Sequence, residues 1–137
     1  MKKQHILFSF LFLIVVLFIT SCEKDTTDLT DITRYHWEVI KIKQPGASSY
    51  STAEGSYVLE FGDTSYKINL DVNDCGGSYG ISGGKRIRIT RGGCTYVCCD
   101  TDFAENLISL LPGMTSYHRK QNKLLLEGEG EIILKKY

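Results

Sequence analysis

Apolar and polar residues alternate over most of the chain beyond residue 34, and this period of two predicts β-strands. The cleanest pattern lies between residues 66 and 72, where one face holds Tyr66, Ile68, Leu70 and Val72. The preceding stretch 57–61 alternates in the same way and ends at Gly62-Asp63, which is a turn sequence. We therefore expect the two stretches to form an antiparallel hairpin.

Further strands are expected on both sides of this hairpin. Residues 36–43 form one of them, and a shift of the apolar phase after Val39 predicts a β-bulge or a local twist near Ile40. The sequence Asn-Asp-Cys-Gly-Gly at 73–77 is expected to interrupt the sheet before a short strand at 78–81. Four more strands are predicted, of which the last three form a meander: 85–90, 115–120, 123–127 and 131–137.

One segment follows a helical period instead. Its apolar residues recur at i, i+4, i+7 and i+8, at Phe103, Leu107, Leu110 and Leu111. Asp100, Thr101 and Asp102 are candidates for the N-cap, and Pro112-Gly113 ends the helix. The complete pattern predicts an α+β fold of mainly antiparallel β-structure, a partly open barrel-like sheet with one helix near residues 101–111.

The N-terminal residues follow neither pattern. Residues 1–5 are short and basic, and residues 6–20 are an almost unbroken apolar run, which together are typical of a secretory signal peptide. The run ends in Ile19-Thr20-Ser21-Cys22, which resembles the lipobox of bacterial lipoproteins. By that resemblance the signal is removed before Cys22, and this cysteine carries the acyl chains, palmitate among them, that anchor the chain to a membrane.

This resemblance implies three parts of the chain: a signal peptide at 1–21, a flexible tether at 22–33 that starts from the lipidated cysteine, and a folded domain at 34–137. Because Glu23 rather than Asp follows Cys22, the usual inner-membrane retention signal is absent, and we expect the outer membrane, with exposure at the cell surface left open. The alternatives are an uncleaved N-terminal anchor and an ordinary signal peptide that is cut elsewhere.

The charge balance limits the class of partner. The chain has 16 basic and 16 acidic residues, and residues 1–21 contain Lys2 and Lys3 but no acid, so the remainder is slightly negative. A nucleic-acid-binding domain needs a clustered basic surface, and we expect no nucleic-acid partner. The expected partners are the membrane, through the lipid on Cys22, and a protein or small molecule that the sequence does not identify.

Several short motifs occur in a fixed order between Tyr35 and Leu134. The first is a strand with a tryptophan, Trp37, and the second is an aromatic-Gly-Asp turn, Phe61-Gly62-Asp63. A segment rich in glycine, with a cysteine before a tyrosine, follows at residues 73–79. The last two are a threonine four residues before a cysteine, Thr95 and Cys99, and an Asn-x-Leu-x-Leu hairpin at residues 122–126. This order resembles the META/HslJ family of small bacterial envelope domains. The resemblance implies a β-rich fold, an envelope role of the stress-response type, and no catalytic residue or cofactor.

The cysteines are the main candidates for covalent chemistry in the folded part. The resemblance places Cys75 and Cys99 at the two cysteine positions of the family and implies that they lie close together, whereas Cys94 and Cys98 are additional. Four cysteines allow three pairings. The pairing that joins the adjacent Cys98 and Cys99 is strained and is discounted. Two remain open: Cys75–Cys99 with Cys94–Cys98, and Cys75–Cys98 with Cys94–Cys99.

Other chemistry has weak support in the sequence. His36 and His118 lie in predicted strands beside aromatic residues, where a side chain on a sheet face is the simpler interpretation. The cysteines do not form the two short Cys-x2–4-Cys pairs of a zinc site, and no nucleophile motif is present. We expect a non-catalytic protein without a metal or cofactor. The alternatives are a lipocalin-like small-ligand-binding barrel and an inhibitor of secreted hydrolases.

Overall fold

The computed structural model describes residues 30–137 of the chain. The predicted signal peptide, Cys22 and the tether as far as residue 29 lie outside the described residues. In the described part, no helix is both long enough and apolar enough to cross a bilayer.

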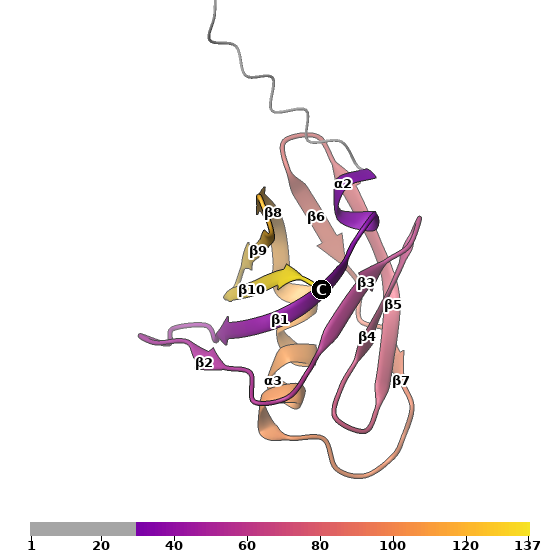
Figure 1. Ribbon diagram of the computed structural model, residues 1–137, viewed down its shortest axis with the longest axis vertical. Helices are drawn as coiled ribbons and strands as arrows, with labels where there is room; N and C mark the ends of the chain where they lie inside the picture. The colour runs from indigo at the N-terminus through magenta and orange to yellow at the C-terminus, as the bar shows by residue number, and fades with distance from the viewer. Residues whose placement is uncertain (1–29) are drawn as a thin grey trace, which may run out of the picture.

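Antiparallel strands dominate the fold and close into an eight-stranded barrel (Figure 1). The strands of the ring are β1 (His36–Lys43), β3 (Val58–Phe61), β4 (Ser65–Asn69), β5 (Asp74–Ser82), β6 (Arg86–Ile89), β8 (Met114–Lys120), β9 (Lys123–Gly128) and β10 (Glu131–Lys136). Neighbours in space follow this order, and β10 pairs with β1 to complete the ring. Two short strands lie outside it: β2 (Ser51–Thr52), which pairs with β1, and β7 (Gly93–Cys94), which pairs with β5.

The structure confirms the mainly antiparallel prediction and several of its details. Strands β3 and β4 form the predicted hairpin, with Val58 opposite Asn69. Strands β8, β9 and β10 form the predicted meander. The register of β1 against β10 shifts between Val39 and Lys41, which is the bulge expected near Ile40.

The predicted break at residues 73–77 is misplaced, because β4 ends at Asn69 and β5 begins at Asp74, so the turn covers residues 70–73. Val72, which was expected on the apolar face of a strand, lies exposed in this turn. The glycines that suggested a turn instead allow close contact between strands. A Cβ atom on Gly77 would lie 2.6 Å from the carbonyl oxygen of Thr90, and one on Gly92 would lie 1.5 Å from the carbonyl oxygen of Gly76. Glycine in a strand interior often marks such an approach of another backbone segment.

The folded part also begins earlier than the predicted boundary at residue 34. Residues Thr30–Thr33 form the short helix α2, and Ile32 is almost completely buried. The carbonyl oxygen of Ile32 accepts a hydrogen bond of 2.8 Å from the indole Nε1 of Trp37. The last residues of the predicted tether therefore belong to the barrel.

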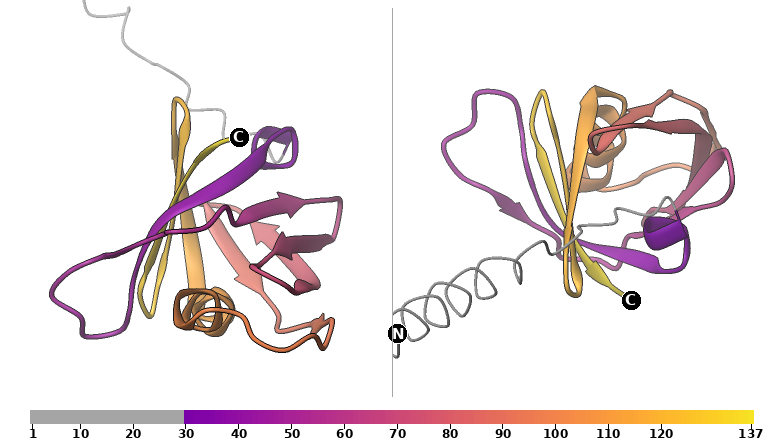
Figure 2. Two further views of the ribbon diagram at one scale, coloured as in Figure 1. Left: turned by 60° about the horizontal axis from the view of Figure 1, so that its bottom comes forward. Right: turned by 90° about the horizontal axis from the view of Figure 1, so that it is seen from above.

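The barrel has two ends of different construction, which we call the α2 end and the α3 end (Figure 2, left). The α2 end holds α2, the tips of the β3–β4, β5–β6 and β8–β9 hairpins, and the C-terminus. The α3 end holds helix α3 (Asp102–Leu110), the short helix η1 (Leu111–Gly113), the β4–β5 turn and β7. The predicted late helix is thus confirmed, and it covers one end of the barrel.

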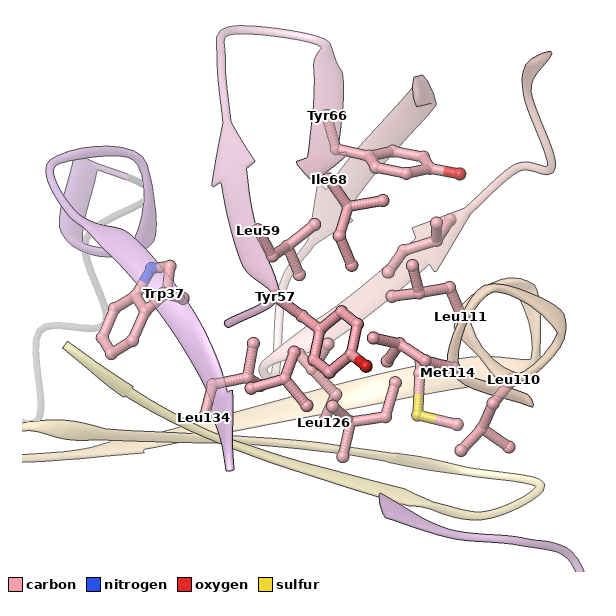
Figure 3. Close-up of a cluster of buried hydrophobic side chains, with 14 of the residues drawn as sticks. Trp37, Tyr57, Leu59, Tyr66, Ile68, Leu110, Leu111, Met114, Leu126 and Leu134 are labelled. Atoms are coloured by element: carbon pink, nitrogen blue, oxygen red, sulfur yellow. The ribbon is translucent and has the colours of Figure 1, made fainter. Parts of the chain in front are cut away.

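The interior of the barrel is filled with side chains (Figure 3). Inward-facing residues of the strands and of the helical segment have no more than 1 % of their surface accessible to water, among them Trp37, Leu59, Ile68, Leu107, Leu111, Met114, Leu126 and Leu134. A side chain that lined a cavity wide enough for a ligand would keep some accessible area. These side chains therefore pack against one another and leave no central binding chamber between them.

Candidate functional site

The exposed apolar side chains of the described part are concentrated at the α3 end. The large apolar residues that stand in solvent are Val72, Tyr96, Val97 and Tyr137, and Tyr96 is completely exposed. Val72 lies in the β4–β5 turn, and Tyr96 and Val97 lie in the segment that connects β7 to α3. We call residues 95–101 the exposed loop, and Val72, Tyr96 and Val97 the apolar patch. Exposed apolar groups that gather in one place are typical of interaction sites.

One disulfide holds the start of the exposed loop against the barrel. Cys94 in β7 lies directly opposite the buried Cys75 in β5, and the two form a disulfide with their Cα atoms 4.0 Å apart. Both pairings left open by the sequence are therefore wrong, since each joined Cys75 to Cys98 or Cys99. The reason lies in β7, whose two residues are too few to give an alternating pattern.

The second disulfide joins the adjacent residues Cys98 and Cys99, the combination that was discounted from the sequence. Once Cys75 is bonded to Cys94, each of these two cysteines has only the other as a partner within the described residues. The backbone accommodates the bond with φ 148° at Cys99, a region that residues other than glycine rarely adopt. Both cysteines are exposed, so the disulfide forms part of the surface beside the apolar patch.

The side chain of Asn73 connects the exposed loop to the β4–β5 turn. This residue is 8 % exposed and is the buried polar side chain of the described core. Its Nδ2 donates to the carbonyl oxygen of Val97 and to Asp100 Oδ2, each at 2.7 Å. Its Oδ1 accepts from Thr95 Oγ1 at 3.0 Å and from the Val97 N–H at 2.8 Å. All four bonds cross between the two segments, so they fix the conformation of the loop.

Asp100 supplies a second set of contacts between the same segments. Its Oδ1 accepts from the N–H groups of Val72 and Asn73, at 3.0 and 3.3 Å. Burial alone would raise the pKa of this carboxyl, but the hydrogen bonds from Val72 and Asn73 outweigh burial and lower its pKa. The carboxylate form is therefore the one that holds the loop.

Asp71 acts in the same way at the start of α3. Its Oδ2 accepts from the N–H and the hydroxyl of Thr101, at 3.0 and 2.7 Å, and its Oδ1 accepts from the Tyr57 hydroxyl at 2.9 Å. Burial opposes ionisation here too, but the bonds from Thr101 and Tyr57 outweigh it, so the pKa of Asp71 is lowered. Thr101 is the N-cap of α3, and its Oγ1 accepts from the Ala104 N–H at 3.3 Å.

A groove of about 680 Å³ lies beside this network, between β2, the start of β3 and the start of α3. Its floor includes Tyr57 and Phe103, whose rings stack with centroids 5.1 Å apart. Its rim carries Glu54, Asp71 and Asp102. The groove shares Asp71 and Thr101 with the network that holds the exposed loop, and it carries negative charge on its edge.

The other predicted candidates lie apart from this site. His36 contacts Glu60 at 2.9 Å and His118 contacts Glu127 at 3.1 Å, and both pairs are exposed on the barrel wall. No three His, Cys, Asp or Glu side chains among residues 30–137 converge as metal ligands would. Cys22, the predicted lipidation site, lies outside the described residues.

Asn73 and the apolar patch were not recognised in the sequence as functional. A polar residue beside a cysteine and two glycines looks like part of a turn, and its burial depends on a loop more than twenty residues away. Tyr96 and Val97 could have been noticed as apolar residues in a segment without strand or helix periodicity. Of the three predicted N-cap candidates, Thr101 is confirmed as the cap, whereas Asp100 instead accepts hydrogen bonds from the β4–β5 turn.

Comparisons with known proteins agree with this architecture. The model of the META domain family matches residues 30–136. No curated protein is similar enough to count as a match. Two solved structures share the fold at 13 % identity. A DUF4847 family protein from Bacteroides vulgatus has a TM-score of 0.58, over 76 % of this chain and 93 % of that one. A protein from Burkholderia xenovorans has a TM-score of 0.63, over 86 % of this chain and 96 % of that one.

Proposed function

The chain belongs to the META domain family, and we propose that it is a lipid-anchored envelope protein that binds a partner protein through its exposed loop, without catalysis. The observation that carries the proposal is the apolar patch. Val72, Tyr96 and Val97 stand in solvent on segments that Asn73, Asp100 and the disulfide Cys75–Cys94 hold in place. A rigid apolar projection loses little conformational entropy on binding, which favours recognition of a partner.

The anchor is proposed from the N-terminal sequence. The basic start, the apolar run and Ile19-Thr20-Ser21-Cys22 support lipidation of Cys22 after removal of residues 1–21. Glu23 supports the outer membrane as the destination. Acyl chains contribute about 0.8 kcal/mol per buried methylene, and more than one chain is needed for stable anchoring of a folded domain.

The chemistry of the loop suggests the kind of partner. Tyr96 and Val97 fit an apolar pocket, and aromatic side chains are enriched among residues that dominate protein interfaces. The α3 end, which carries the patch, is rich in carboxylates: Glu54, Asp71, Asp74, Asp100 and Asp102. We therefore propose a protein partner whose apolar pocket has a basic rim, in an envelope process of the integrity or stress-tolerance type.

The experiment uses cells that lack the protein and are exposed to detergent or another envelope stress. The wild-type gene should restore tolerance, whereas Cys22→Ala and the double variant Tyr96→Ser, Val97→Ser should not, although the latter remains folded and anchored. Arg88→Ser is the control, because it removes a large exposed side chain from β6 on the barrel wall, outside both the exposed loop and the α2 end. Full tolerance with the Tyr96, Val97 variant would contradict the role of the loop.

A specific observation also favours one alternative function, the inhibition of a secreted hydrolase. A protruding loop that is braced by disulfides and hydrogen bonds suits an inhibitor that occupies the active site of a secreted hydrolase. Inhibition of a panel of secreted proteases, lost in Tyr96→Ser, would favour it over an envelope partner. The ligand-binding barrel has no such support, since the described interior is filled with side chains.

A further inference from the structure

We propose that the α2 end of the barrel is a membrane-binding surface that lies against the anionic headgroups of the bilayer. The proposal rests on the lipid anchor proposed above, because α2 is the first described element and joins the domain to the stretch after Cys22. It adds a second attachment to the membrane, made by the folded domain itself. It also sets the direction in which the exposed loop points.

The charged residues of the described part are separated between the two ends. The α2 end carries Arg34, Lys85, Arg86, Arg119, Lys120, Lys123, Lys135 and Lys136. Asp63, Glu38 and Glu60 are the acidic residues there, with Glu38 opposite Lys135 and Glu60 opposite His36 in the strand register, so the basic residues remain in excess. The α3 end carries Glu54, Asp71, Asp74, Asp100, Asp102, Glu105, Glu127, Glu129 and Glu131, against Lys41, Lys43 and Arg91. Although the net charge of the chain is near zero, basic residues are in excess at the α2 end and acidic residues at the α3 end.

The register of the last three strands places lysines directly opposite one another. Lys120 in β8 is opposite Lys123 in β9, and Lys123 is opposite Lys135 in β10. All three are exposed. Lys135 pairs with Glu38 at 2.7 Å, but Lys120 and Lys123 have no acidic partner among the described residues. Like charges directly opposite each other destabilise a sheet, so this row of lysines is best explained by an external anion that neutralises it.

Two tyrosines near the lysines favour a bilayer over a soluble polyanion as the external anionic partner. Tyr137 is 72 % exposed at this end, and its N–H is fixed by the carbonyl oxygen of His36 at 2.9 Å. Tyr35 lies beneath Lys136, whose Nζ is 3.6 Å from the ring centroid, with Arg119 on the same ring at 5.1 Å. Tyrosine combines an apolar ring with a polar hydroxyl and is enriched where protein meets both lipid and water.

The distances in the fold make the two ends electrostatically independent. A strand as long as β5, Asp74–Ser82, spans roughly 30 Å along its own axis, which is roughly 20–25 Å along a barrel whose strands tilt by about 35–45°. Interactions with surface charges decay over about 10 Å at 0.1 M salt. With the α2 end on the membrane, the carboxylates of the α3 end therefore lie outside the range of lipid repulsion. Each lysine or arginine near an anionic surface strengthens binding by about fivefold.

The experiment uses the mature chain with Cys22→Ala, secreted from an ordinary cleavable signal so that it carries no lipid. Residues 32–134 contain the complete described core, so this chain keeps the fold. It should sediment with phosphatidylcholine vesicles that contain about 30 % phosphatidylglycerol and not with pure phosphatidylcholine, and about 0.5 M salt should release it. Equal binding to both vesicles, or to neither, would overturn the proposal.

A pair of variants locates the surface. Lys120→Glu with Lys123→Glu should lower the partition coefficient at least about tenfold. Lys41→Glu with Arg91→Glu changes the net charge equally at the other end and should lower it less than about twofold. An equal loss in both would mean that net charge, not the α2 end, governs binding. Mass spectrometry of Cys22 in the native chain tests the anchor separately, so failure of one claim is distinguishable from failure of the other.

Discussion

At the scale of single residues, Asn73 explains why the exposed loop has a defined conformation without belonging to the barrel. Its amide uses both donor hydrogens and accepts two hydrogen bonds, all from groups of the loop. Aspartate could not replace it, because a second carboxylate would face Asp100 and the two donors would be lost. The side chain of Asn73 thus supplies the loop with hydrogen bonds that a neighbouring strand would supply within the sheet.

Replacing Asn73 by alanine should lower the free energy of unfolding by about 1–3 kcal/mol, since it leaves partners in the loop without hydrogen bonds. The backbone amides of residues 95–100 should exchange hydrogen faster than in the wild type, and the increase should exceed what the lower free energy of global unfolding would cause. Asn106→Ala is the control, because this side chain is exposed on α3 and makes no hydrogen bond within residues 30–137. Equal exchange in the two variants would show that Asn73 does not hold the loop.

The two aspartates predict a pH dependence with a definite sign. The pKa of Asp71 and that of Asp100 are both lowered in the folded protein. The folded state therefore binds fewer protons than the unfolded chain, and the stabilisation is complete above the ordinary aspartate pKa of about 3.9 and is lost as the pH falls below it. Asp100→Asn should be less stable than the wild type at pH 7, and urea unfolding should show this gap narrowing towards pH 3. A gap that widens in acid would contradict the assignment.

The disulfides should differ greatly in their contribution to stability. Cys75 and Cys94 are 19 residues apart, and closing a loop of that size stabilises by about 3 kcal/mol through the unfolded chain. Cys98 and Cys99 are adjacent, so their bond restricts the unfolded chain very little. We expect Cys75→Ser with Cys94→Ser to lower the midpoint of urea unfolding strongly, and Cys98→Ser with Cys99→Ser to change it slightly. Peptide mapping under non-reducing conditions checks the pairing itself.

At the scale of elements, α3 links the core to the end of the barrel that carries the exposed loop. Thr101 caps the helix and also binds Asp71, so the helix begins where the exposed loop ends. Ala104, Leu107 and Leu110 then bury one face of the helix against the strands. The position of the loop therefore depends on how this helix packs.

Leu107→Ala should lower the free energy of unfolding by about 2–5 kcal/mol, because the side chain is completely buried and the barrel cannot collapse around the space it leaves. Ser109→Ala, on the exposed face of the same helix, should change it by less than about 0.5 kcal/mol. Denaturant unfolding of both variants measures the difference. A small effect of Leu107→Ala would mean that α3 covers the barrel without packing into it.

Elements with a strong local period were predictable from the sequence, and those defined by distant partners were not. The β3–β4 hairpin, the final meander and α3 each alternate or repeat within their own residues. Strand β5 begins with Asp-Cys-Gly-Gly, which reads as a turn, and its pairing depends on the contacts of Gly76 and Gly77 with other backbone segments. Strand β7 is two residues long, so neither it nor the Cys75–Cys94 bond that it creates has a local signature.

At the scale of the whole molecule, the barrel separates two surfaces. Its interior is filled with side chains, which makes the barrel rigid. The basic end holds α2, the first described element, and the acidic end carries the apolar patch. The same arrangement explains why the net charge of the chain did not indicate either surface. The basic and acidic residues cancel in the total, and only the strand register shows that they lie at opposite ends.

The central claim is that the protein acts by presenting its exposed loop to a partner protein. Photo-crosslinking in intact cells tests it most directly, with a photoreactive phenylalanine analogue in place of Tyr96 in one variant and Tyr137 in another. We expect a discrete protein adduct from position 96 that disappears when Val97→Ser is added, and lipid but no protein adduct from position 137. No protein adduct at position 96, or the same adduct from both positions, would contradict the account.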